Sequence, residues 1–517
     1  MRLDDARFLA GPNRFALVPT AALRVALDPD ERGDAVAARL AAAARVVFAA
    51  HGLPVPAPVR FAGRRTVSIG VPCPNQVRAD LLLDLLAMEL GLAPAESGAV
   101  SISLADLSDA SDAPPLAAVP IAAITGTNGK STTTRLLARI LTAAGRTPGV
   151  TTSDGVWVGG RQVLDGDFTG PRGAARALAE PGIDIGVLEV ARGGLLLKGL
   201  GVPAVDVGVV TNVAADHLDL DGIETVEELS GVKGIIVRAT RPEGRVVLNA
   251  ADATTPTLRA QSAAPVVLFA RDPASPAVVD HRAAGGEALL VRDGWLLRAV
   301  GAVEEPIVPI AEVPVALNGL ARHNVENALA AAAAALALGA PPAAVGDGLR
   351  VFQPTPEDNP GRLNLFRHAG RDVIVDFAHN AHGLNALLDV ADGLAAPRDG
   401  RVLVVVGTAG DRRDEDIAAL GEIAARRCAE VLIKQTERYT RGRPFPEMLA
   451  LYRAGIARAG RDPDTVPLVP DEVGGLRQAL ARSVPGDVIA IMCQEQRQEL
   501  WDHLRDPAAD LRPAAPA

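Results

Sequence analysis

The sequence predicts an α/β protein built of three domains, and three features of the chain carry this prediction. Its 517 residues exceed what one hydrophobic core usually serves. From residue 121 onward, short β-branched runs such as "IAAI" and "IGVLEV" alternate with helical stretches, which is typical of a largely parallel sheet. The same alternation starts again after Pro360, with "DVIVDFAHN" and "RVLVVVGTAG", so a second α/β domain is expected.

Composition narrows the class of protein. A 48% hydrophobic fraction with 22% charged residues indicates a globular chain, and the net charge of −10 argues against a nucleic-acid partner. The start "MRLDDARFLAG" has acids where a signal peptide carries basic residues, and no apolar run approaches the ~18 residues of a membrane span. Cys73, Cys428 and Cys493 are too far apart to predict a disulfide framework. We expect a cytoplasmic protein.

The domain bounds follow changes in composition. Residues 1–104 mix short apolar segments with Pro and Gly and should form a small N-terminal α+β domain. Residues 105–118, rich in Ser, Asp and Pro, are expected to be a linker. Residues 119–315 form the central domain and end in a hairpin-rich β segment. Residues 316–505 form the C-terminal domain, with a strong helix at 323–338 at the junction, and residues 506–517 should be a disordered tail.

The stretch "IAAITGTNGKSTTTRLLARIL", residues 121–141, predicts a nucleotide phosphate site. A buried strand leads into a glycine turn and then an amphipathic helix, whose N-terminal N–H groups attract an anion. Lys130 would reach the outer phosphates and the Ser131 hydroxyl would help to hold Mg²⁺. The expected ATP contacts are Gly126, Thr127, Asn128, Gly129, Lys130, Ser131 and Thr132. The alternative is a bare glycine turn before a helix.

The lysine content points to the same site. The chain has 52 Lys and Arg residues, of which only Lys130, Lys198, Lys233 and Lys434 are lysines. A lysine kept in such an arginine-rich chain is a candidate for work that a bulky guanidinium cannot do, and chance survival is the alternative.

Longer motifs place the chain by resemblance. "GTNGKST" resembles the ATP loop of the Mur ligases and folylpolyglutamate synthetases, which couple ATP to amide-bond formation. "TTSDGVWVGG", "LEVARGGLLLKGLG" and "GDRRDEDI" resemble the Mur-ligase-like half of cyanophycin synthetase, and the likeness runs through most of residues 119–500. The segment "FLAGPNRFALVP" resembles the N-terminal domain of that enzyme more faintly. The ATP-grasp domain that cyanophycin synthetase carries between these two parts has no counterpart here, because only the linker joins them.

The resemblance implies a Mur ligase fold, with a central P-loop ATPase domain and a Rossmann-like C-terminal domain. It also implies metal ligands. Glu189 ends the strand "IGVLEV", His217 follows the strand "VGVV", and Lys233 falls where several Mur ligases carry a carbamylated lysine. With Ser131 these residues would hold Mg²⁺. The alternatives are a solvated carboxylate for Glu189, a helix-capping role for the neighbouring Asp216 and an exposed helical position for Lys233.

Further residues are assigned by the same resemblance. Asn324 and Asn327, one helical turn apart, would lie at the adenine, and Arg362 and Asp376 would approach the ribose and phosphates. His379 would line the closed site, so the expected catalytic set is Lys130, Lys233, His217 and His379. The expected substrate residues are Thr152, Asp167, Arg192, Gly193, Asp411, Arg412 and Arg413. Capping or loop roles are the alternative for these polar residues, and a solvated charge run is the alternative for Lys434 and its arginine neighbours.

The predicted function is an ATP- and Mg²⁺-dependent ligase, which adds an amino acid to a peptide or small-acid acceptor through an acyl phosphate. The expected partners are the small-molecule acceptor and the amino acid. The candidate protein partners are a second copy of the chain and a separately encoded ATP-grasp ligase. No nucleic-acid or membrane partner is expected. One rival is a ligase of the folylpolyglutamate or peptidoglycan kind. The other is a nucleotide-binding subunit that performs no ligation itself. ADP formation that depends on an added amino acid separates the second rival from the ligases.

Overall fold

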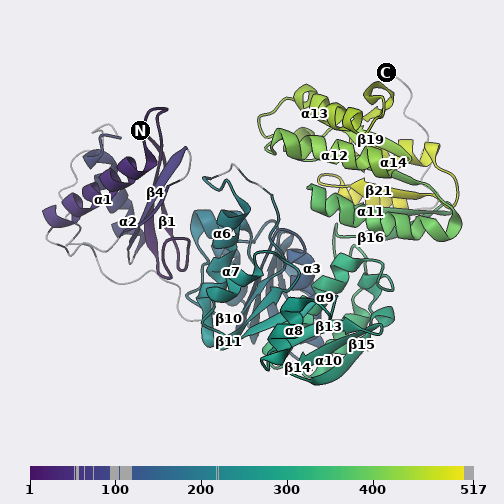
Figure 1. Cartoon of the computed structure of the whole chain (residues 1–517), viewed down its shortest axis with the longest axis horizontal. Helices are drawn as coiled ribbons and strands as arrows, with labels where there is room; N and C mark the ends of the chain where they lie inside the picture. Colours follow the sequence, from purple (N-terminus) through teal and green to yellow (C-terminus); the bar gives the residue numbers. More distant parts are fainter. Residues whose placement is uncertain are drawn as a thin grey trace. The chain divides into compact units, whose positions relative to one another are not determined.

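The computed structural model describes residues 1–51, 53, 58–62, 65–73, 75–92, 104, 107, 119–216, 218 and 221–505. The predicted tail 506–517, and the predicted linker except Leu107, lie outside these residues. The chain divides into two compact units (Figure 1). The first contains Met1–Ala215, Asp219–Ile307 and Asn327–Gly348, and the second contains Asp216–Leu218, Val308–Glu326 and Leu349–Ala517.

The N-terminal part of the first unit is an antiparallel sheet with helices on one face. Its strands are β1 (Arg2–Leu9), β2 (Thr20–Ala26), β3 (Val59–Ala62) and β4 (Thr66–Pro72), in the order β1-β2-β4-β3. Helices α1 (Gly33–Ala50) and α2 (Gln76–Glu89) pack on the face that carries Leu23, Val25 and Ile69. The predicted α+β character is confirmed. The other face carries Ala22, with Leu9 and Phe15 packed beside it, and charged residues between them.

The central sheet is parallel in its middle and antiparallel at its two ends, as the alternating pattern predicts. Its order is β15-β14-β13-β12-β11-β10-β5-β9-β6-β7-β8. The strands are β5 (Ile121–Thr125), β6 (Pro148–Thr152), β7 (Gly155–Val158), β8 (Arg161–Asp165), β9 (Ile185–Glu189), β10 (Val205–Val210), β11 (Thr240–Asn249), β12 (Val266–Ala270), β13 (Glu287–Arg292), β14 (Trp295–Val300) and β15 (Val303–Pro309). The last three confirm the predicted hairpin-rich segment, although its first residues belong to a helix.

Helices connect and cover these strands. They are α3 (Lys130–Ala143), α4 (Pro171–Leu178), α5 (Arg192–Lys198), α6 (Val226–Ala239), α7 (Thr255–Ala260) and α8 (Pro276–Ala283). Helices α6 and α7 pack against β10 and β11 (Figure 1), and α3 packs against β9 and β6. In the strand order, β5 lies between β10 and β9, where the order of the sheet reverses. Open α/β sheets bind ligands at such a switch point.

The second unit has its own mixed sheet, in the order β16-β17-β21-β18-β19-β20. The strands are β16 (Asn364–His368), β17 (Arg371–Asp376), β18 (Val402–Val406), β19 (Glu430–Lys434), β20 (Leu468–Val469) and β21 (Val488–Met492). The helices are α11 (Ala381–Ala395), α12 (Asp414–Arg427), α13 (Phe445–Arg458), α14 (Glu472–Arg482) and α15 (Arg497–Arg505). Alternate residues of β18 enter two different cores, which explains why this strand reads as a continuous apolar run.

The junction helix is divided differently from the prediction. We expected helix 323–338 to belong to the C-terminal domain, but the first unit holds Asn327–Gly348, which is most of α9 (Arg322–Ala337) and of α10 (Pro342–Val351). Ala328 and the six alanines at 330–335 are almost fully buried, and these small side chains allow close packing. A Cβ on Gly348 would lie 2.5 Å from the Cα of Ile140 in α3, which places α10 directly against the first unit.

Candidate active site

The glycine turn that follows β5 requires both of its glycines. Gly129 caps α3 with a φ of +86°, a conformation that L side chains rarely adopt. A Cβ on Gly126 would lie 1.8 Å from the Thr211 Oγ1, and a Cβ on Gly129 would lie 2.2 Å from the Asn327 Oδ1. The loop is therefore closely packed on both sides, and its backbone geometry is set before any ligand arrives.

The segment that follows β10 holds this loop. The Thr127 N–H donates to the Asn212 carbonyl at 2.8 Å, and the Asn128 N–H donates to the Asn212 Oδ1 at 2.9 Å. The Thr211 hydroxyl donates to the Asn128 carbonyl at 2.6 Å. Sequence reasoning did not single out Thr211 and Asn212, although they follow directly after a buried strand next to β5 in the sheet.

Lys130 lies over the loop that it follows. Its ammonium donates to the carbonyls of Gly126 at 3.1 Å and of Thr127 at 2.8 Å. Because both acceptors belong to the glycine turn, the positive charge is held where the expected phosphates would lie.

Ser131 and Glu189 form the pair that the sequence predicted from their motifs. The Ser131 hydroxyl donates to the Glu189 Oε1 at 3.0 Å, and Glu189 is only 3% exposed, which excludes the alternative of a solvated carboxylate. Ser153, which was not predicted, completes the group, because its N–H donates to the Glu189 Oε2 at 3.3 Å and its Oγ lies 3.5 Å from the Ser131 Oγ. A carboxylate with two hydroxyls is an all-oxygen set of the kind that Mg²⁺ prefers.

This set differs from a metal site built of ionisable side chains. Within the described ranges, no group of three or more His, Cys, Asp and Glu side chains is placed to hold a metal ion. His217, a predicted ligand, lies outside the described residues. The residues that are described thus fit a Mg²⁺ held by one carboxylate, hydroxyls and waters, as is usual for Mg²⁺ bound with nucleotides.

Lys233 is buried rather than exposed. It lies in α6 and is only 2% exposed, so the alternative of a lysine on a solvated helix face is wrong. A lysine inside the fold of a chain that otherwise uses arginine remains a candidate for a special role.

The two asparagines that were predicted to lie at the adenine each make a hydrogen bond to the protein. Asn327 accepts a hydrogen bond from the Thr133 hydroxyl of α3 at 3.3 Å, in the first unit. Asn324, one turn earlier, donates to the Val315 carbonyl at 3.0 Å, in the second unit. Both asparagines are buried, but the two side chains are used by different units.

The loop after β17 brings Arg362, Asp376 and His379 together within the second unit. Asp376 accepts from the N–H groups of Leu363 and Ala378, both at 2.6 Å. The Arg362 guanidinium lies 4.4 Å from the centre of the Phe377 ring, and the rings of Phe377 and His379 are 5.5 Å apart. The predicted set therefore forms one cluster at the carboxyl end of β17.

Asp216 contacts this cluster. Its carboxylate accepts from the Arg412 Nη1 at 2.8 Å and lies 3.5 Å from the His379 Nε2. Asp216, Arg412 and His379 all belong to the second unit. Arg412 is only 7% exposed, so the surrounding protein fixes its position.

Five of the other predicted substrate residues have side-chain partners within their own unit. Asp167 accepts from the Thr169 N–H and hydroxyl, Thr152 donates to the Gly155 carbonyl, and Arg192 pairs with Asp221 at 3.0 Å. In the second unit, Asp411 pairs with Arg441, and Arg413 pairs with Asp416 at the start of α12. Gly193 has open space where a Cβ would point.

Lys434 is buried, whereas the alternative for this residue was a solvated run of charged side chains. It is 0% exposed, so it is not part of a solvated charge run. Its ammonium donates to the Glu472 Oε1 at 2.5 Å and to the Gln494 Oε1 at 2.6 Å. The Gln494 amide in turn donates to the Ala378 carbonyl at 2.9 Å, next to His379. Burial raises the pKa of Glu472, but Lys434 and the N–H groups of Gln494 and Glu495 lower it more, so that pKa lies below its ordinary value.

Two family models match the chain. One is the Mur ligase middle domain, over residues 124–335, and the other is the Mur ligase glutamate ligase domain, over residues 361–494. Among curated relatives, a cyanophycin synthetase from Trichormus variabilis is 36% identical over 374 residues, which are 72% of this chain and 41% of the relative. The chain therefore spans about two fifths of the length of the cyanophycin synthetases that it matches.

One relative is covered almost throughout. A UDP-N-acetylmuramoyl-L-alanyl-D-glutamate–2,6-diaminopimelate ligase from Xanthomonas campestris is 30% identical over 458 residues, which are 86% of this chain and 84% of that protein.

Solved structures agree on the fold. A bifunctional folylpolyglutamate synthase/dihydrofolate synthase is 21% identical, with a TM-score of 0.54 over 74% of this chain and 89% of that chain. MurF from Acinetobacter baumannii is 17% identical, with a TM-score of 0.53 over 75% of this chain and 77% of that chain. These likenesses confirm the predicted fold class. No helix among the described residues is both long and apolar enough to cross a membrane.

Proposed function

This chain belongs to the Mur ligase family, and we propose that it is an ATP-dependent ligase that joins the carboxylate of a peptide or small acid to the amine of an amino acid. An acceptor carboxylate oxygen attacks the γ-phosphorus of ATP, and ADP leaves. The amine of the amino acid then attacks the acyl carbon, phosphate leaves, and the nitrogen loses a proton. The product is an amide.

The residues of the first unit bind and neutralise the phosphates in this scheme. The glycine turn presents its N–H groups at the start of α3, and Lys130 places a positive charge beside them. Ser131, Ser153 and Glu189 would hold Mg²⁺, which would neutralise the charge that develops on phosphoryl transfer. Catalysis of this kind is mainly positioning and charge stabilisation.

The residues of the second unit and Lys233 carry the finer proposals. Arg362 and Asp376, which lie together within the second unit, would bind the ribose and phosphates of ATP, His379 would line the closed site, and Arg412 would bind the substrate. Lys233 acts as a carbamate, since a carbamate turns a buried ammonium into a carboxylate-like metal ligand. ATP as substrate places the reaction in the cytoplasm.

The single observation that supports the proposal best is the Ser131–Glu189 pair, whose serine directly follows Lys130 in the chain. A glycine turn without catalysis needs no buried carboxylate against its first helical hydroxyl, whereas ATP with Mg²⁺ needs both. A nucleotide-binding subunit without ligation would use the same pair, and the dependence of ADP release on an added amino acid separates it from a ligase. The folylpolyglutamate or peptidoglycan kind of ligase remains a rival for the substrate, not for the chemistry.

The test is ADP release by the full chain with a panel of acceptors and amino acids, and mass detection of the products. We expect ADP release to require ATP, Mg²⁺, an acceptor and an amino acid together. Glu189→Gln should abolish it, whereas Glu180→Gln, which removes only a surface pair with Arg176, should not. ADP release that ignores the amino acid, or a Glu189→Gln variant with wild-type activity, would refute the proposal.

A further inference from the structure

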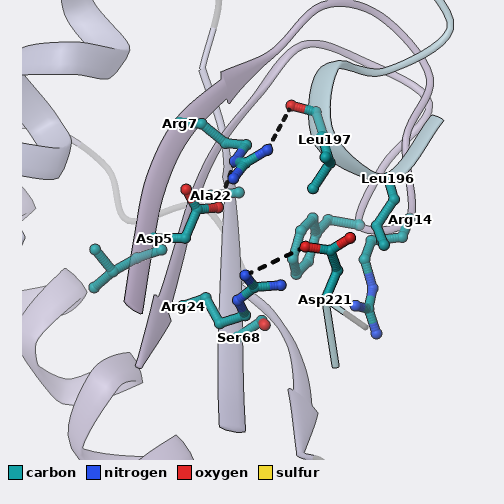
Figure 2. A pocket seen from close by; sticks show the side chains of 11 residues that line it. Asp5, Arg7, Arg14, Ala22, Arg24, Ser68, Leu196, Leu197 and Asp221 are labelled. Atoms are coloured by element: carbon teal, nitrogen blue, oxygen red, sulfur yellow. Dashed lines mark hydrogen bonds and ion pairs between the residues drawn. The ribbon is translucent and has the colours of Figure 1, made fainter. Parts of the chain in front are cut away.

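A pocket lies on the polar face of the N-terminal sheet, in the first unit (Figure 2). Its walls come from three strands, β1, β2 and β4, whose facing positions pair Arg7 with Ala22 and Arg24 with Ser68. Leu196 and Leu197 of α5 and Asp221 close it from the side of the central sheet. The empty space between these side chains is about 310 Å³, a volume that includes open solvent, so the pocket is an open recess that can take one small polar group.

Backbone hydrogen bonds hold the two walls together. The Ala10 N–H donates to the Lys198 carbonyl at 2.8 Å, and the Leu200 N–H donates to the Pro12 carbonyl at 2.9 Å. The Arg7 Nη1 adds a bond to the Leu197 carbonyl at 3.3 Å. The pocket is therefore a built feature of this unit and not a gap between loose segments.

Two of the three arginines in the pocket are used by its own structure. Arg7 pairs with Asp5, and Arg24 pairs with Asp4 and lies 3.6 Å from Asp221. Dashed lines in Figure 2 join Arg7 to Leu197 and Arg24 to Asp221, whereas none ends on Arg14. These pairs account for both aspartates that line the pocket.

Arg14 is different. Its guanidinium lies 4.1 Å from the centre of the Phe61 ring and 5.6 Å from that of Phe15, and the structure gives it no hydrogen-bond acceptor among the described residues. Burial lowers the pKa of Arg14 to about 10, against the attraction of Glu228. The carboxylate of Glu228 is used at the start of α6, where it accepts from the N–H groups of Glu224 and Thr225.

A guanidinium that lies on aromatic rings keeps its in-plane N–H groups for a planar acceptor. Such an arrangement suits a carboxylate, which accepts two parallel hydrogen bonds. Counted with their ion-pair partners, the charges are those of Arg7, Arg14, Arg24 and Arg192 against those of Asp4, Asp5 and Asp221. One positive charge is therefore left over. A monoanion matches this charge, whereas a phosphate dianion would add a charge that Asp5 and Asp221 repel.

The pocket is connected to the proposed reaction site by one short helix. Helix α5 begins at Arg192, three residues after Glu189, and its seven residues span about 10 Å. Arg192 pairs with the Asp221 carboxylate that also lines the pocket. An extended peptide advances about 3.3–3.6 Å per residue, so an acidic group a few residues from the reacting carboxylate can reach the pocket.

We propose that this pocket binds a carboxylate of the acceptor other than the one that is activated, with Arg14 as its principal ligand. The identification of the bound molecule as the acceptor rests on the proposed function. The binding itself needs no ATP. It implies that the acceptor is acidic, with at least two carboxylates.

The probe is the peptide acetyl-Asp-Asp-Asp-amide, with acetyl-Asn-Asn-Asn-amide as its neutral isostere, titrated calorimetrically into the full chain without ATP. We expect the acidic peptide to bind at least 10-fold more tightly than the neutral one. Arg14→Gln should weaken the acidic peptide at least 10-fold, and Arg14→Lys should fall between. Arg60→Gln is the matched control, because Arg60 is the exposed neighbour of Phe61 on β3 and is absent from the pocket lining.

Hydrogen exchange of the wild-type chain gives a second measurement that needs no variant. The acidic peptide should protect the amides of residues 10–26, which include Arg14 and β2. Equal binding by wild type and Arg14→Gln, no binding of the acidic peptide, no protection of residues 10–26, or displacement of the peptide by inorganic phosphate more readily than by succinate would each overturn the proposal. Amino-acid-dependent ADP release is measured in parallel, so that failure of the ligase function and failure of the pocket are distinguished.

Discussion

Breaking the buried Lys434–Glu472 pair should destabilise the second unit by an amount that the structure allows us to estimate. The two side chains are 0% and 1% exposed, and their charged atoms are 2.5 Å apart. Removing one partner of such a pair leaves an uncompensated buried charge and costs about 3–5 kcal/mol, a large part of the stability of an ordinary domain. Lys434→Met and Glu472→Gln should each show this loss.

The double variant should be far less damaged than the sum of the two. Replacing both partners removes both charges, and exchanging a buried ion pair for uncharged groups of similar volume is often neutral. A coupling of about 2–3 kcal/mol or more between the two substitutions is therefore expected from the double-mutant cycle.

Hydrogen exchange measured by mass spectrometry is the suitable assay, because a chain of several units has no single free energy of unfolding. Amides of β19 and α14 should exchange about 100-fold faster or more in each single variant, since about 1.4 kcal/mol corresponds to a factor of ten. Amides of β5 and β9 in the first unit are the internal control. Additive effects of the two substitutions, or single variants with wild-type exchange in β19, would show that the ion pair does not stabilise the unit as argued.

Four further outcomes are expected. The pKa of Glu472 is lowered in the folded chain, so the stabilisation by this carboxylate is present above its unfolded pKa of about 4.3 and is lost as the pH falls through the folded pKa. Urea unfolding at different pH values should show this loss in the wild-type chain but not in Glu472→Gln. Lys130→Ala should abolish ATP turnover with unchanged circular dichroism, since its ammonium contacts carbonyls of the loop and not the hydrophobic core; turnover near the wild-type rate would contradict the phosphate site. If Lys233 is carbamylated, Lys233→Arg should be nearly inactive and acetate should partly restore ADP release by Lys233→Ala; a robustly active Lys233→Arg enzyme eliminates the carbamate. This chain alone should make no cyanophycin from aspartate, arginine and ATP, because it has one ATP site where two additions alternate, and growth of polymer detected by mass would sink that expectation.

The sequence by itself determined the fold class and the phosphate loop, because both depend on local patterns. Apolar runs that alternate with helical stretches require buried parallel strands, and the strand–glycine–helix order around Lys130 has few other solutions. The scarcity of lysine was also informative, since Lys233 and Lys434 are buried and Lys130 lies over the loop, although Lys198 is exposed at the end of α5.

Only the tertiary structure decided which side chains meet. Ser131 and Glu189 are 58 positions apart, and Lys434 and Glu472 are 38 apart, so neither pair leaves a periodic trace in the sequence. Ser153 joins the first pair because β6 lies next to β9, and α9 is shared between two units because its alanine face fits one of them. Arg14, for which the described part of the chain offers no hydrogen-bond acceptor, lies against Phe61 in a pocket that residues of β1, β2, β4 and α5 line together. Local pattern selects the elements, but the charge and hydrogen bonding of each site depend on neighbours that only the folded chain brings within a few ångströms.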